Sequence, residues 1–251
     1  MTLSFAAAKP RSAKRFSDAA GDTDVSETTP ATITPKVERL AALVGASAPA
    51  FVPVVDDPYG LYGFCNTGVL EKVRNDGGGI CFGWIIWEWP GVFLTAEFHA
   101  VWLDGAGQYV DITPKPQNER RIVFAPAPEH EADFDFNARP LNARLRTYGD
   151  RSEEIRLRVA SLGDTKRRYE ERRAEAKGMT IQEWLTQKLP TDPVIGLVDS
   201  FLEACDKFDQ HMDRLSDHNR NFTPDRTWYL LGERRAQLLT RIRRQLKSPP
   251  P

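Results

Sequence analysis

Two tight turns divide the middle of this chain into runs with the composition of β-strands. The turn dipeptides Pro90-Gly91 and Asp104-Gly105 separate residues 80–89, 92–103 and 108–113. These runs are rich in β-branched and aromatic side chains, which favour strands. Connections this short join antiparallel neighbours, and Asp-Gly between two such runs is a strong hairpin signal. The sequence therefore predicts a small antiparallel sheet.

A helix is predicted just before the first strand. Residues 66–75 place Val69, Leu70 and Val73 on one face, and the glycines at 77–79 end the helix because glycine readily adopts positive φ. A shorter helix is expected at residues 35–44. Helices combined with an antiparallel sheet give the α+β fold class.

The last hundred residues have helical patterns throughout. Residues 151–177 are highly charged with a thin apolar stripe, and we expect one exposed helix there. Thr180 and Glu183 form a capping-box pattern that starts a helix at about residue 181. Amphipathic helices are expected at 194–215 and 224–246.

Composition divides the chain into three parts. Residues 1–35 have almost no large apolar side chains, so we expect a disordered N-terminal arm. Residues 36–150 hold the predicted sheet, and residues 151–251 form the helical C-terminal region. Residues 51–150 carry 8 basic and 14 acidic side chains, whereas 151–251 carry 20 and 16, so the two parts have opposite net charge.

Bulk properties exclude several classes of protein. The formal net charge of −1 gives no electrostatic basis for binding nucleic acid or a membrane surface. No apolar run is long enough to span a bilayer, and residues 1–15 place the apolar stretch before the basic one, the reverse of a secretory signal. The three cysteines are odd in number and widely spaced, which favours a reducing compartment and a cytoplasmic location.

Cys65, His99 and Asp111 are the candidate catalytic residues. A thiol, an imidazole and a carboxylate are a nucleophile, its base and the group that orients the base. Cys65 opens the predicted helix, where an imidazole and the helix N-terminus would lower the thiol pKa. If Leu103 pairs with Gln108, His99 lies within one residue of Asp111 across the hairpin.

Four further residues are candidates for substrate binding. The Cys65 backbone N–H is free to stabilise an oxyanion, and the second donor is Asn66, Tyr62 or another backbone N–H. Trp84 and Trp102 belong to a dense aromatic group that forms either a sheet core or the wall of a substrate cleft.

Structural roles compete with each assignment. A single Cys or His is most often a buried core residue, and an Asp before Thr-Pro is most often a turn cap. A zinc site from Cys65, Cys81 and His99 lacks the closely spaced ligand pair typical of such sites. Glu97 fits either recognition of a basic substrate group or simple surface exposure.

The order and spacing of these residues resemble the catalytic core of the transglutaminase-like superfamily, within the papain-like cysteine enzymes. Its motifs correspond to Gly63-Phe64-Cys65, residues 79–84, the His99-Ala100-Val101-Trp102 strand and the Asp111-Ile112-Thr113-Pro114 end. The resemblance covers only about residues 60–115. Val101 and Ile112 depart from the family's usual Trp and Pro.

The resemblance implies a papain/transglutaminase-like core in which a Cys-bearing helix packs on the sheet. It implies a hydrolase or acyltransferase, such as a thiol protease, acting on a peptide or amide bond through a Cys65-His99-Asp111 triad and a thioester. The substrate would be a protein or peptide, with no cofactor and no metal. The alternative is an inactive relative of the fold that serves as a protein-interaction module. The sequence indicates no oligomeric state.

Overall fold

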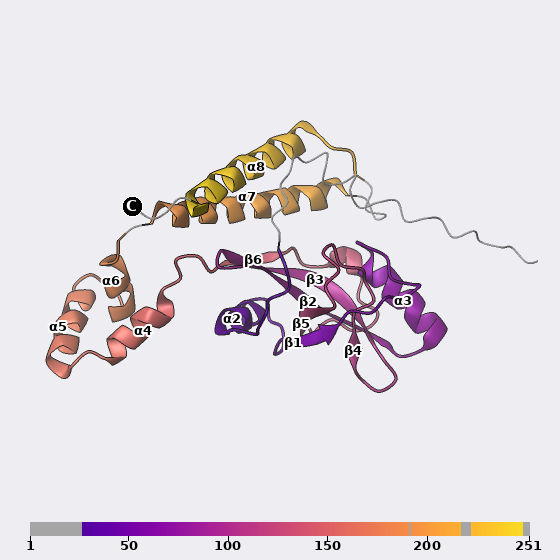
Figure 1. Ribbon diagram of the computed structural model, residues 1–251, viewed down its shortest axis with the longest axis horizontal. Coiled ribbons are helices and arrows are strands. Elements are labelled where there is room, and N and C mark those ends of the chain that lie inside the picture. Colours follow the sequence, from indigo (N-terminus) through magenta and orange to yellow (C-terminus); the bar gives the residue numbers. More distant parts are fainter. Residues whose placement is uncertain (1–26, 191, 217–221, 248–251) are drawn as a thin grey trace, which may run out of the picture.

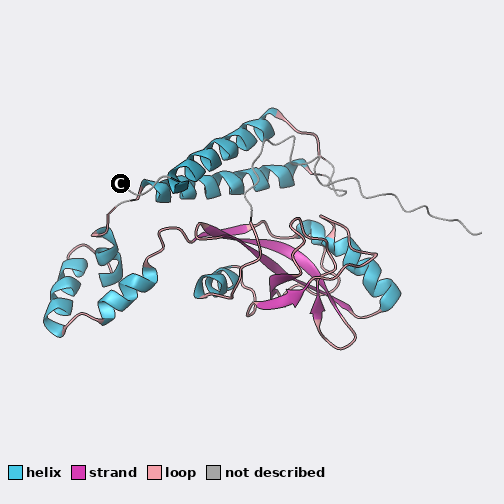
Figure 2. Ribbon diagram, in the orientation of Figure 1, coloured by secondary structure: helices cyan, strands magenta, loops and turns pink. Residues whose placement is uncertain are grey.

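The computed structural model describes residues 27–190, 192–216 and 222–247. Within these residues the chain is an α+β protein with an antiparallel sheet flanked by helices (Figures 1 and 2), which confirms the predicted class. The elements run in the order α2 (Pro35–Leu43), β1 (Ala50–Pro53), α3 (Cys65–Asp76), β2 (Gly79–Trp89), β3 (Phe93–Leu103), β4 (Tyr109–Val110), β5 (Arg121–Pro126), the 3-10 helix η1 (Phe136–Ala138), β6 (Ala143–Arg146), α4 (Ser152–Ala160), α5 (Asp164–Glu175), α6 (Ile181–Gln187), α7 (Pro193–Leu215) and α8 (Arg226–Lys247).

The β2–β3 hairpin is the centre of the sheet. The two strands pair along their whole length, from Gly79 opposite Leu103 to Trp89 opposite Phe93, which confirms the predicted hairpin. Gly83 leaves room in β2 for the neighbouring β5, since a Cβ there would lie 2.4 Å from the Ala125 carbonyl oxygen. The hairpin thus supports the residues in the middle of β3 from β2 and β5.

The third predicted strand is shorter than expected and shifted by one residue. β4 holds only Tyr109 and Val110, and Leu103 pairs with Tyr109 rather than Gln108. Asp111 leaves the hairpin and forms a parallel bridge with Val54 beyond β1. This second partner pins the end of β4 to a segment that is distant in sequence.

The sheet contains three strands that the sequence pattern did not predict. The strand order is β1-β5-β2-β3-β4, and β6 also pairs with β3. β4 contacts β3 at residues 102–103, and β6 contacts it at residues 93–96. In the described part of the chain, β3 residues 97–101 therefore have no strand partner on that side, and we call this stretch the open edge of β3.

Different helices cover the two faces of the sheet. Even-numbered β2 and β3 residues such as Phe82, Trp84 and Phe98 form one core with α2 and α3. At the other face, Phe93 packs against α7 and α8, which lie together on one side of the sheet in Figure 1. A smaller core, which includes the odd-numbered β2 and β3 residues Ile85 and Val101, completes this second face. The site-bearing strand β3 is therefore fixed from both sides.

Helix α3 begins at Cys65, as the sequence predicted, and Gly77, with φ of +77°, caps its C-terminus. Its Gly68 lies against the preceding loop, where a Cβ would come within 2.5 Å of the Tyr59 carbonyl oxygen. This close approach sets the position of the first turn of α3 and therefore of Cys65.

The helical C-terminal region differs from its prediction in one respect. The single helix expected over 151–177 is two helices, because the chain breaks between α4 and α5 at Leu162-Gly163. The Thr180 capping box and the long amphipathic helices α7 and α8 are confirmed. Helices α4 to α6 form a small group set apart from the sheet in Figure 1, which we call the helical trio.

Part of the expected N-terminal arm is packed on the sheet. Thr28 forms a bridge with Glu88 of β2, and Thr34 caps α2. Residues 27–34 are therefore ordered, contrary to expectation, because they find partners on β2, β5 and α2. Residues 1–26, the rest of the arm, lie outside the described residues. Over the described ranges, no helix combines the length and apolar character needed to cross a membrane.

Candidate active site

His99 and Asp111 form a buried hydrogen-bonded pair. Nε2 of His99 donates to Oδ2 of Asp111 at 3.0 Å, and the Thr113 backbone N–H donates to Oδ1 at 2.8 Å. Asp111 is fully buried, and its backbone bonds to Pro53 and Val55. The contact predicted across the hairpin is present, and its carboxylate is held from two directions.

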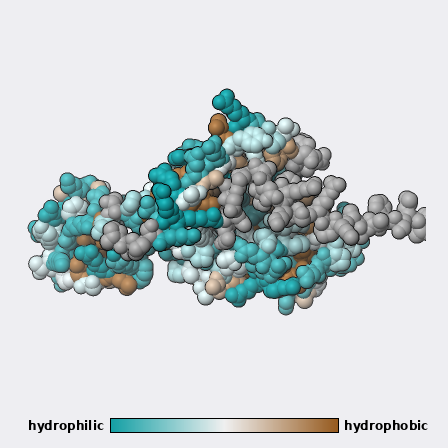
Figure 3. All heavy atoms as spheres, turned by 45° about the horizontal axis from the view of Figure 1, so that its top comes forward, coloured by the Kyte–Doolittle hydropathy of each residue, from teal (hydrophilic) through white to brown (hydrophobic). Residues whose placement is uncertain are grey.

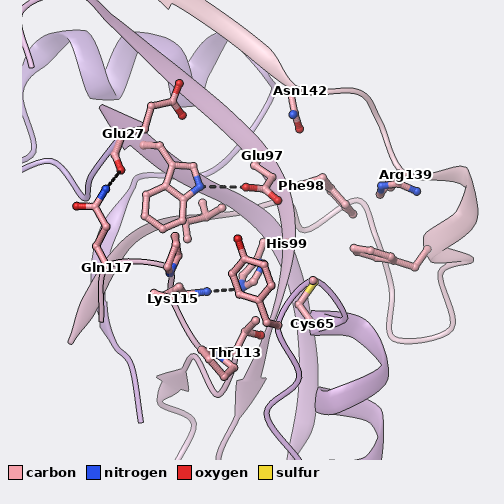
Figure 4. A pocket seen from close by; sticks show the side chains of 17 residues that line it. Glu27, Cys65, Glu97, Phe98, His99, Thr113, Lys115, Gln117, Arg139 and Asn142 are labelled. Atoms are coloured by element: carbon pink, nitrogen blue, oxygen red, sulfur yellow. Dashed lines mark hydrogen bonds between the residues drawn. The ribbon is translucent and has the colours of Figure 1, made fainter. Parts of the chain in front are cut away.

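Cys65 lies against the open edge of β3. The thiol interacts with the His99 side chain and with the Ala100 backbone N–H, because no strand among the described residues occupies that position. Nε2 of His99 faces Asp111, which leaves Nδ1 for the thiol. Figure 4 shows Cys65, from α3, beside His99. The sequence alone could not establish that Cys65 lies near the His-Asp pair. In the structure the thiol is beside His99.

The electrostatics of the three residues favour a charged pair. Burial opposes ionisation of Cys65, but the charge and hydrogen bond of His99 lower the thiol pKa below its ordinary value. Burial and the charge of Lys115 act against protonation of His99, yet Asp111 and Cys65 raise its pKa to about 9. Burial also opposes ionisation of Asp111, but His99 and Lys115 lower its pKa to about 2. These shifts favour a thiolate beside an imidazolium over the uncharged pair.

The thiol opens into a pocket of about 490 Å³. Cys65 and His99 line it together with Tyr62, Glu97 and Lys115 (Figure 4). Cys65 is only 7% exposed, so this pocket is the route by which a reactant reaches the sulfur. The Cys65 backbone N–H lies in the first turn of α3, where helical N–H groups have no intrahelical acceptor.

The four candidate substrate-binding residues lie in different environments. Tyr62 is 53% exposed and lines the pocket. Asn66, Trp84 and Trp102 are not among its lining residues. Trp84 is buried in the core with α2 and α3, while the Trp102 indole N–H donates to the Gly77 carbonyl. Asn66 has a buried side-chain oxygen that accepts no hydrogen bond from the described residues.

Several pocket residues were not singled out in the sequence. The Glu27 carboxyl belongs to the expected disordered arm, and burial raises its pKa to about 7. Gln117 lies in the segment after β4 and donates to the Glu27 carbonyl. Lys115, four residues after Asp111, is buried and contacts both Asp111 and His99. Its position between two prolines, directly after a predicted strand, was the sequence feature that could have pointed to it.

The zinc alternative has no support in the geometry of the described residues, where no group of three or more His, Cys, Asp or Glu side chains is arranged to hold a metal. Cys81 instead contacts Tyr109, and burial raises the pKa of its thiol. Cys205 is buried in α7, far along the chain from the pocket residues.

Comparisons of this chain with protein-family models, with curated proteins and with solved structures found no match. The function must therefore be argued from the chemistry of the pocket itself.

Proposed function

We propose that this protein is a cysteine-dependent hydrolase or acyltransferase that acts on a peptide or amide bond. The observation that carries the proposal is the hydrogen-bonded His99-Asp111 pair beside a thiol of lowered pKa at the start of α3, in an open pocket. We propose in addition that residues 60–115 are a papain/transglutaminase-like core, on the basis of the order and spacing of the motifs.

The reaction follows from the charged form of the pair. The Cys65 thiolate attacks the carbonyl carbon of the amide, and the Cys65 backbone N–H donates to the oxygen that becomes negative. The protonated His99 ring gives its proton to the leaving amine, so the C–N bond breaks and a thioester forms on Cys65.

The second half-reaction returns the enzyme to its starting form. Neutral His99 takes a proton from water or from an acceptor amine, which attacks the thioester carbon. The carbon–sulfur bond breaks, the product leaves as an acid or a new amide, and thiolate and imidazolium are restored. Asp111 keeps the ring oriented in both steps.

Alkylation tests the proposal without knowledge of the substrate. At pH 6, iodoacetamide should modify Cys65 at least about tenfold faster than a small free thiol, because an ordinary thiol is almost entirely protonated there. Peptide mass mapping assigns the modification, with Cys81 and Cys205 as internal controls. His99→Gln should slow Cys65 to the rate of an ordinary buried thiol.

Activity is then tested with protein and peptide mixtures, by following new amino termini, released ammonia and new cross-links. The wild type should produce one of these, and Cys65→Ala should produce none. If Cys65 reacts no faster than the free thiol, the enzyme proposal fails and the interaction-module alternative replaces it.

A further inference from the structure

Lys115 is a buried cation that the proposed reaction does not itself require. Its side chain is 4% exposed, although lysine is rarely buried without a strong partner. Its Nζ lies 2.5 Å from Oδ2 of Asp111 and 3.4 Å from Nε2 of His99. The same carboxylate oxygen therefore accepts from both the imidazole and the ammonium.

The charges around the ring come from three elements. Cys65 approaches from α3, while Asp111 and Lys115 belong to the segment after β4. Glu97 lies two residues from His99 on the same strand face, and its charge opposes ionisation of Cys65. These are the charged groups that surround the ring.

Lys115 changes the charge balance at the ring. With Lys115 present, the charges of Cys65, His99, Asp111 and Lys115 sum to zero in both forms of the Cys65-His99 pair, since Asp111 and Lys115 cancel each other, and Glu97 adds the same negative charge to either form. Without it, the uncharged form of the pair would leave Asp111 as an unpaired buried anion. Such an anion strongly favours protonation of its neighbour, so the ring would hold its proton more tightly.

We propose that Lys115 is a positioning residue, which fixes Asp111 and weakens that carboxylate's hold on protonated His99 so that the ring releases its proton to the leaving group. This inference rests on the proposed function. Its physical basis is that a second cation on Oδ2 competes with the imidazolium for one acceptor. In line with this, the charge of Lys115 acts to lower the pKa of His99.

The test is the pH dependence of Cys65 alkylation between pH 4 and 11. In the wild type the rate should rise in two steps, first as the thiolate forms and again as His99 loses its proton near its pKa of about 9. Lys115→Met removes a cation and should move the upper step to higher pH by about one unit, with any shift of the lower step in the same direction. Lys115→Arg keeps the charge and should leave both steps in place.

The outcomes separate the two proposals. A wild type with one step near the pKa of an ordinary thiol contradicts the proposed function. Two steps in the wild type that stay in place in Lys115→Met contradict only the role of Lys115. If circular dichroism shows that Lys115→Met is unfolded, Lys115→Gln is measured instead, since it removes the charge and keeps a donor; an unmoved upper step in that variant overturns the inference.

Discussion

The active site and helix α4 of the helical trio use charged residues in opposite ways. At the active site a few charged side chains are buried and share acceptors, as Lys115 and His99 share Asp111. In the trio, pairs such as Arg156 with Glu153 and Arg151 with Glu154 are exposed. The space-filling view in Figure 3 shows that hydrophilic residues dominate the surface of this group. The comparison indicates that burial, rather than the number of ion pairs, decides which charges matter.

The largest effect should come from Asp111→Asn. Removing this charge leaves the Lys115 ammonium buried without its partner, so the unfolding free energy should fall by about 4 kcal/mol. Urea denaturation at pH 6 measures it. The matched control is Asp150→Asn: hydrogen bonds from Ser152 and Arg39 overcome burial and hold the Asp150 pKa at about 2 as well, but the Arg39 partner is exposed. A similar loss in both variants would contradict the role given to burial.

Phe201→Ala should have the next largest effect. Phe201 of α7 is 1% exposed and its ring lies 5.9 Å from that of Phe93 on β3. Loss of this contact should lower the unfolding free energy by about 3 kcal/mol. Leu230→Ala on α8, where the side chain is 54% exposed, is the control and should change little. Equal effects would show that α7 is not anchored to the site-bearing strand through this ring.

The pH dependence of the unfolding free energy should reflect the ionisation of Asp111 and His99. The Asp111 pKa of about 2 lies below its ordinary 3.8, so this group stabilises the fold above about pH 4 and the stabilisation, about 2 kcal/mol, is lost as pH falls toward 2. The His99 pKa of about 9 lies above 6.5, so its stabilisation is complete below pH 6.5 and is lost as pH rises through 9. Both stabilising effects come from the same His99-Asp111 ion pair, so their free energies are not added.

Unfolding midpoints in urea at pH 2.5, 5.5 and 9.5 measure this profile, with wild type and Asp111→Asn compared at each pH. The difference between the two proteins should be greatest at pH 5.5 and smaller at both extremes. A constant difference would mean that Asp111 acts through packing alone.

The smallest effect should come from the helical trio. Arg156→Ala, Glu153→Ala and the double variant should have unfolding midpoints that cannot be distinguished from the wild type, because water and salt screen this exposed pair. A double-mutant cycle measures the coupling between the two side chains. A clear coupling would mean that this exposed pair contributes to stability as the buried pairs of the active site do.

Local patterns explain which parts of the fold were predictable. The β2–β3 hairpin and the start of α3 at Cys65 follow from turn dipeptides, strand-forming runs and glycine stops. Strands β1, β5 and β6 carry only four to six residues, and their pairing depends on partners far away in sequence. The break at Gly163 was missed because the charged pattern continues on both sides of it.

The site was predictable to the same extent. His99 and Asp111 meet through a hairpin, so register arguments within one residue were sufficient. The approach of Cys65 depends on where β4 and β6 stop pairing with β3, which no short stretch of sequence encodes. The burial of Lys115 follows from the same tertiary arrangement. Its partners lie four and sixteen residues away, so only the first lay within a local pattern.

The open edge of β3 has a consequence for folding as well as for chemistry. An unpaired strand edge exposes N–H and C=O groups that can template pairing with another chain, and proteins usually cover or shorten such edges. Here β4 and β6 shorten the open stretch from its two ends, and Cys65 meets the Ala100 N–H within it. The first turn of α3 thus protects against aggregation at the same place where it presents the thiol. A change that displaces this turn, such as Gly68→Ala, puts reactivity and solubility at risk together.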